Sequence, residues 1–96
     1  MKVVVHWLVH VDVLEAMEFY EKEGGTRLAV EFFSEYERTL ELIRQRPYSF
    51  AITKGVHRRV NFDRFPFHAI FTVMPDFALM LVVRHDRRNP DFGLDR

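Results

Sequence analysis

The chain has 96 residues and lacks cysteine, any long hydrophobic run and any net charge. Without cysteine, disulfides, thiolate zinc sites and cysteine nucleophiles are excluded, and a reducing cytoplasm is the expected location. The longest uninterrupted apolar run, residues 77–83, has seven residues, whereas a helix needs about 20 to cross a membrane. The sequence therefore predicts no transmembrane segment.

Charge is balanced overall but unevenly distributed. Fourteen basic residues match fourteen acidic ones, so the chain lacks the broad positive field of a protein that tracks nucleic acid. Residues 1–50 hold six basic and nine acidic side chains, whereas residues 51–96 hold eight and five. Strong non-specific binding to nucleic acid is therefore not expected.

The chain does have enough apolar sequence for one core, because 48% of its residues are hydrophobic. This predicts a single domain over residues 1–96. Residues 3–11 alternate in polarity and predict a first strand. His6 and His10 interrupt this stretch and no small-residue cleavage site follows, so we interpret it as a strand and not as a signal peptide.

A helical period follows the first predicted strand. Asp12 is expected to cap a short helix with apolar residues at i, i+3, i+4 and i+7. Gly24 and Gly25 are expected to end it, because glycine enters left-handed backbone without a steric penalty. A second helix is predicted over residues 27–46, where Pro47 stops the pattern. Together these segments predict a helical hairpin.

From the middle of the chain onward, apolar and polar residues again alternate with a period of two. Residues 48–55 are interpreted as a connecting loop, and alternation predicts strands over residues 56–62 and 67–74. A turn at residues 75–76 precedes the nearly continuous apolar run Phe77–His85, which predicts a central strand covered on both faces.

The remaining segment, residues 86–96, is expected to form an irregular tail. The resulting order, β-α-α-β-β-β, predicts an α+β fold in which the helical hairpin packs on one face of a mostly antiparallel four-stranded sheet. The other face of the sheet is expected to be partly open.

Three groups of residues carry a resemblance to a known family. They are Arg58 and Arg59, the tetrapeptide Arg-Phe-Pro-Phe at residues 64–67, and the hydrophobic strand running out through residues 85–90. With the β-α-α-β-β-β order, they resemble the RelE/ParE superfamily of toxins from bacterial type II toxin-antitoxin systems, most closely its ParE branch, over nearly the whole chain. The resemblance implies a small cytoplasmic toxin that a cognate antitoxin wraps and neutralises.

The resemblance also bears on the chemistry. RelE-branch toxins cut messenger RNA on the ribosome with basic side chains on the scissile phosphate, often aided by a C-terminal tyrosine. At the corresponding positions this sequence has His68 for arginine, Asp86 for a basic residue and Phe92 for tyrosine. An aspartate repels a phosphate and phenylalanine cannot transfer a proton. The ParE-like interpretation is therefore favoured, in which the toxin binds DNA gyrase and blocks its supercoiling cycle.

Two alternatives stay open, so the sequence does not decide whether the protein is an enzyme. A RelE-like ribosome-dependent endoribonuclease would use His85 as general acid or base, with Arg84, Arg87 and Arg88 binding a phosphate. The other alternative is a non-toxic relative that only binds an antitoxin. The resemblance implies no cofactor for either.

A binding surface for the target or the antitoxin is predicted from basic side chains and from apolar residues on the open sheet face. Its predicted residues are Arg58, Arg59, Arg64, Phe67, Leu79, Leu81, Arg87 and Arg88. For the first three arginines, pairing with the acidic helices is an equally weighted alternative.

No metal site is predicted from the histidines. His6 and His10, if both in one strand, lie about 13 Å apart, too far to share a metal ion. His57 and His68 have no carboxylate or thiol at ligand spacing in the sequence.

Overall fold

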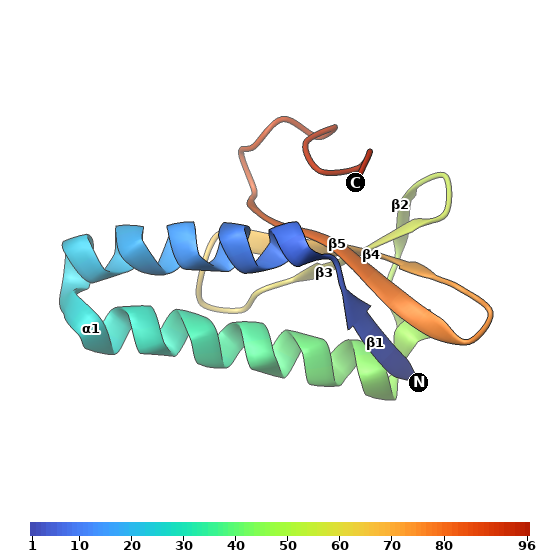
Figure 1. Cartoon of the computed structure of the whole chain (residues 1–96), viewed down its shortest axis with the longest axis horizontal. Helices are drawn as coiled ribbons and strands as arrows, with labels where there is room; N and C mark the ends of the chain where they lie inside the picture. Colours follow the sequence, from blue (N-terminus) through green and yellow to red (C-terminus); the bar gives the residue numbers. More distant parts are fainter.

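The computed structural model describes all 96 residues. Its elements are β1 (Lys2–Val5), α1 (Trp7–Gln45), a 3-10 turn η1 (Pro47–Ser49), β2 (Ile52–Lys54), β3 (His57–Asn61), β4 (Phe67–Val73) and β5 (Phe77–His85) (Figure 1). None of its helices combines the length and hydrophobicity needed to span a bilayer.

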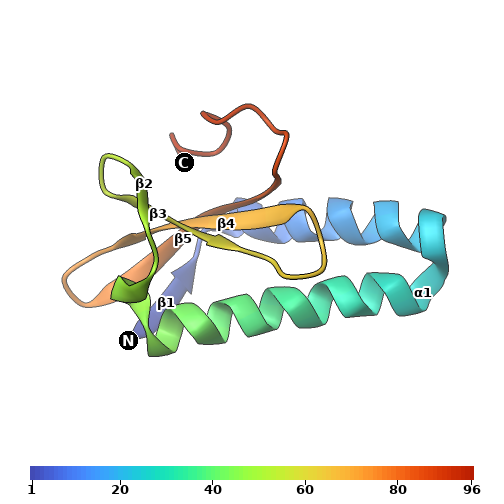
Figure 2. The same cartoon turned by 180° about the vertical axis from the view of Figure 1, so that it is seen from behind.

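The long helix α1 is a hairpin of two arms. Gly25 interrupts it with φ 83° and ψ 179°, a conformation that glycine adopts without a Cβ clash. The two arms run antiparallel and side by side (Figures 1 and 2). The second arm ends at Gln45, and Pro47 follows two residues later. The predicted helical hairpin is thus confirmed.

The start of the chain differs from the prediction, because β1 ends at Val5 and the helix already begins at Trp7. His6 is the N-cap, and its Nδ1 accepts a hydrogen bond from the backbone N–H of Leu8 at 3.1 Å. The strand predicted over residues 3–11 was wrong because a short apolar run does not separate a strand from a buried helix. Its second half forms helix, so the strand spacing assumed for His6 and His10 was wrong too.

The sheet has five strands in the order β1-β5-β4-β3-β2. Strand β1 pairs parallel with β5, and the other pairs are antiparallel. The α+β class is confirmed, but the predicted four-stranded, mostly antiparallel sheet is corrected to a five-stranded mixed one. The missed strand, β2, lies in the predicted loop; it has three residues, all exposed, so no burial alternation marks it.

A β-bulge in β5 changes which of its side chains point to each face of the sheet. Ile70 pairs with Val82 and Phe71 with Met80, which leaves Leu81 without a partner in β4. The extra residue shifts the alternation of side chains. Met80 therefore packs in the core beneath α1, whereas Leu81 and Val82 pack on the opposite face. The predicted burial of β5 on both faces is confirmed.

The opposite face of the sheet is covered by residues 86–96, which form turns and no helix or strand. Phe92 and Leu94 pack against Leu81 and Val82 there. Figures 1 and 2 show this tail on the side of the sheet opposite to the second arm of α1. The sheet face expected to be partly open is thus largely occupied by the chain itself.

Gly93 of the tail packs tightly against strand β5. It has φ +85°, and a Cβ at this position would lie 2.6 Å from Cβ of Val82. A Gly93→Ala variant is expected to lose about 1–3 kcal/mol of unfolding free energy, because strained backbone and overpacking add. Urea unfolding of Gly93→Ala and of Gly55→Ala, which also has positive φ but open space around it, separates the two effects. Equal losses would show that the contact with Val82 contributes nothing.

Candidate functional site

A polar network lies where β3, β4 and β5 meet the tail, and we call it the His68 network. His68 is almost fully buried, and its Nδ1 lies 2.8 Å from Oδ1 of Asp86. Its Nε2 accepts a hydrogen bond from Nε–H of Arg84 at 2.8 Å. Arg59 completes the network by pairing with Asp86 at 3.4 Å. The sequence shows no carboxylate at ligand spacing from His68, and Asp86 reaches it from 18 residues away through the pairing of β4 with β5.

The hydrogen bonds fix the tautomer of His68. Because an arginine N–H only donates, Nε2 must be unprotonated, and the proton sits on Nδ1, facing Asp86. Burial lowers the pKa of His68 below its ordinary value; the hydrogen bond to Asp86 opposes this shift, and the charges of Arg59 and Arg84 add to it. The network thus holds a neutral imidazole.

This neutral imidazole makes stability depend on pH. The unfolded chain binds a proton on His68 near the ordinary pKa of 6.5, whereas the folded chain binds it only at lower pH. The free energy of unfolding is therefore expected to fall as the pH drops through this value. In His68→Gln the amide can accept from Arg84 and donate to Asp86 without titrating. Urea midpoints between about pH 7.5 and about pH 5.5 should fall less steeply in this variant; an unchanged slope contradicts the assignment.

Arg84 ties this network to the tail. Its Nη1 donates hydrogen bonds to the backbone carbonyls of Pro90 at 2.8 Å and Phe92 at 2.7 Å. Burial lowers the pKa of this guanidinium, and the charge of Arg59 adds to the effect. Arg84 is 8% exposed, so the side chain is committed to holding the tail.

Three of the four candidate catalytic residues, Arg84, His85 and Arg88, line a small pocket of about 190 Å³ between the first arm of α1 and the tail, and Arg87 lies outside it. Arg84 pairs across the sheet with His68, whereas the neighbouring His85 packs edge-on against Phe67, which faces the helical layer. Arg87 and Arg88 lie exposed in the tail. No carboxylate pairs with either.

Of the five arginines predicted for binding, Arg58, Arg59 and Arg64 have partners within the chain. Arg64 pairs with Glu31 of the helical hairpin at 2.9 Å, as the alternative interpretation expected. Arg58 instead donates to the carbonyl of Phe50 at 2.8 Å and lies over the ring of Tyr48. Arg59 belongs to the His68 network. Pairing with the helices therefore accounts for only one of the three.

The predicted apolar binding residues are less accessible than expected. Leu81 is buried beneath the tail and Leu79 is half-buried beside it. Phe67 packs on the other face, against the helical layer. These residues do not form one open groove.

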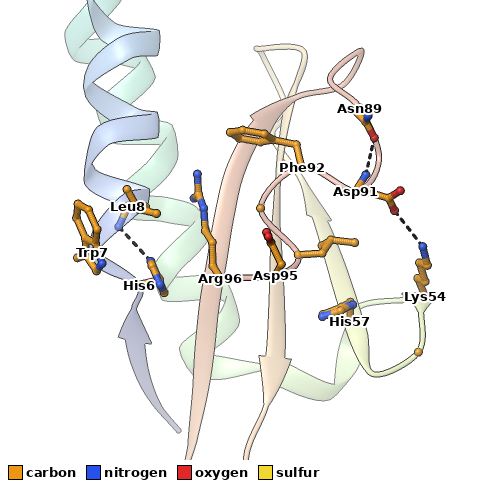
Figure 3. Close-up of a pocket in the computed structure, with 13 residues that line it drawn as sticks. His6, Trp7, Leu8, Lys54, His57, Asn89, Asp91, Phe92, Asp95 and Arg96 are labelled. Atoms are coloured by element: carbon orange, nitrogen blue, oxygen red, sulfur yellow. Dashed lines mark hydrogen bonds and ion pairs between the residues drawn. The ribbon is translucent and has the colours of Figure 1, made fainter.

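An open groove of about 1220 Å³ lies beside the tail instead (Figure 3). Its walls come from the start of α1, the turn between β2 and β3, and residues 89–96. Lys54 pairs with Asp91 across it at 3.0 Å, and His57 lines it with a buried Nδ1 that has no hydrogen-bond partner. The sequence did not predict this groove, because it joins three segments distant in sequence.

Another contact found only in the structure fixes the end of the tail. Arg96 forms two hydrogen-bonded contacts with the carboxylate of Asp12, at 2.6 and 2.9 Å, and donates to the carbonyl of Leu81 at 3.0 Å. The other acceptor bond of Asp12 comes from the backbone N–H of Val83. Asp12 was predicted to cap a helix; that prediction was wrong, since it lies inside α1.

Comparison with known proteins gives a likeness among solved structures but none among sequences. No family model matches the chain, and no curated protein sequence matches it. Among solved structures, a chain described as "Chromosomal ParDE TA system from P. aeruginosa" is similar, with a TM-score of 0.80 and 17% identity. The alignment covers 88% of this chain and 95% of that one. The chain therefore shares its fold with a chain of a ParDE system, as the resemblance implied.

Proposed function

We propose that this protein is the toxin of a type II toxin-antitoxin system, that it acts by binding DNA gyrase, and that a cognate antitoxin neutralises it. The fold shared with a chain of the ParDE system over 95% of that chain supports the toxin class. The basic and aromatic residues quoted for the ParE branch support it from the sequence. Fold alone does not specify function, so the choice of mechanism depends on the site.

The His68 network is the observation that supports binding over RNA cleavage. Phosphoryl transfer needs basic groups that are free to stabilise negative charge on the phosphate. Here both ring nitrogens of His68 are engaged, and Arg84 is occupied by His68 and by two tail carbonyls. Asp86 adds a negative charge beside them. No tyrosine follows Tyr48 to serve as a proton donor.

Induction of the protein in a bacterial host without an antitoxin tests this proposal. Newly made DNA and newly made protein are pulse-labelled over the following minutes. An early fall in DNA synthesis with translation intact is the expected result, together with inhibition of supercoiling by purified gyrase. An early fall in protein synthesis would contradict it, and unimpaired growth would indicate a non-toxic relative.

The endoribonuclease alternative is supported by Arg87 and Arg88, which lack carboxylate partners and lie two and three residues after His85. It is also supported by the small pocket that His85 shares with Arg84 and Arg88. If ribosome-bound message is cut, His85→Gln should abolish cutting while leaving the fold intact, because His85 is only half-buried. Under the gyrase proposal, the same variant should inhibit supercoiling as the unmodified protein does.

A further inference from the structure

The outer surface of the first arm of α1 carries an apolar stripe that nothing in the fold covers. Trp7, Val11 and Leu14 lie at i, i+4 and i+7 and therefore share one face of the helix. Trp7 is 68% exposed and Leu14 is 60% exposed. The buried residues of this arm, such as Val9 and Val13, point to the sheet. Figure 3 shows Trp7 at the start of the helix, where it also forms part of the wall of the groove beside the tail.

Unpaired carboxylates continue this stripe along the same arm. Glu18 lies four residues after Leu14, and Glu21 lies seven residues after it, so they follow on the same face. Glu15 flanks them, and Glu23 closes the arm. All four are exposed, and none forms an ion pair within the chain.

The second arm of the hairpin shows the opposite behaviour. Glu31, Glu35 and Glu41 each pair with an arginine of the same chain. On the first arm, by contrast, Glu15, Glu18 and Glu21 follow one another at i, i+3 spacing and repel one another. The basic residue of this stretch, Lys22, lies four residues after Glu18 but forms no ion pair with any of them. Ion pairs within the chain thus engage most acidic residues of the second arm, whereas the four exposed ones of the first arm have no such partner.

We propose that the face formed by Trp7, Val11, Leu14, Glu15, Glu18 and Glu21, the outer helix face, docks a basic amphipathic helix of a partner protein. The exposed indole and leucine supply the apolar anchor, and the carboxylates select lysine and arginine beside the apolar residues of the partner. A second copy of this chain would bring like charges together on this face. The proposal concerns a surface outside the His68 network and does not depend on gyrase as the target.

A fluorescence titration of the full chain tests this proposal directly. Trp7 is the only tryptophan, so its emission reports on this face and on the adjoining edge of the groove. The probe is a peptide of about 18 residues, or five helical turns, in which leucines recur with the helical period and lysines fill the other positions. We expect a shift of the emission to shorter wavelength, saturable binding, and weakening by salt. A peptide with glutamate in place of lysine should not bind.

Variants separate specific docking from non-specific attraction. Leu14→Ser is expected to weaken binding about tenfold, since it removes an exposed apolar anchor. Glu15→Gln combined with Glu18→Gln should weaken binding and flatten its salt dependence. Val56→Ser, at an equally exposed apolar residue of the β2–β3 turn, serves as the matched control and should not change it. Equal binding by all three variants would overturn the proposal.

Two further outcomes would also overturn it. Equal binding of the lysine and glutamate peptides would show that charge plays no part, and an emission shift on raising the protein concentration alone would identify a second copy as the occupant. Toxicity is scored separately by induction. A chain that binds the peptide but does not arrest growth contradicts the proposed function only, and a toxic chain that ignores the peptide contradicts this inference only.

Discussion

Replacing Phe32 by alanine is expected to lower the free energy of unfolding by about 3–5 kcal/mol. Its side chain is fully buried between the helical hairpin and the sheet. Four aromatic rings surround it, with centroids 5.0 to 5.5 Å away: Tyr20, Phe62, Phe65 and Phe67. The substitution leaves a cavity. The surrounding rings cannot move in to fill it, because they come from three different segments and each is held in place by its own backbone.

The neighbouring Phe33 provides the matched control. It is 38% exposed, so Phe33→Ala should cost about 1 kcal/mol or less. A domain of this length has a total stability of about 5–14 kcal/mol, so the two variants should be clearly separated by urea unfolding followed by circular dichroism. Similar losses for both would mean that the aromatic cluster around Phe32 is not the centre of the core.

The parts of the fold that the sequence predicted well are those with a long and unambiguous pattern. The second arm of α1 shows a helical period over many residues, and Pro47 marks its end. Strand β5 was predicted with its observed bounds, since its apolar run is too short for a helix between two turns. The first strand was predicted too long, because its short apolar run is compatible with both strand and helix. Strand β2 was missed, because none of its residues is buried.

The candidate site was harder to predict, because its contacts join distant positions. His68 and Asp86 are 18 residues apart, and they meet only through the register of β4 with β5. Asp12 and Arg96 are 84 residues apart. One local signal for the Asp12 contact was available in the sequence. Asp12 lies three residues after Val9 and one before Val13, which are both buried. Its charge therefore interrupts the buried side of the helix. Such a carboxylate requires a partner.

Removing that partner is the second large effect. Arg96→Ala is expected to lower the free energy of unfolding by about 3–5 kcal/mol, because it leaves the carboxylate of Asp12 buried and without its counter-charge. The two side chains are only 9% and 8% exposed. The same guanidinium also holds the carbonyl of Leu81. Loss of the contact should release the tail and uncover Leu81 and Val82, which a dye that binds exposed apolar surface can detect before global unfolding.

Two further variants distinguish the ion pair from a general effect of removing charge. Arg88→Ala also removes an arginine that lies over the ring of Phe92, at 3.8 Å, but Arg88 is exposed and has no carboxylate partner, so its loss should be small. Asp12→Leu combined with Arg96→Met replaces the buried pair by apolar groups and should recover most of the stability lost in Arg96→Ala. If the double variant stays as unstable as the single one, the stability depends on the hydrogen bonds to the Leu81 carbonyl and the Val83 N–H and not on the ion pair itself.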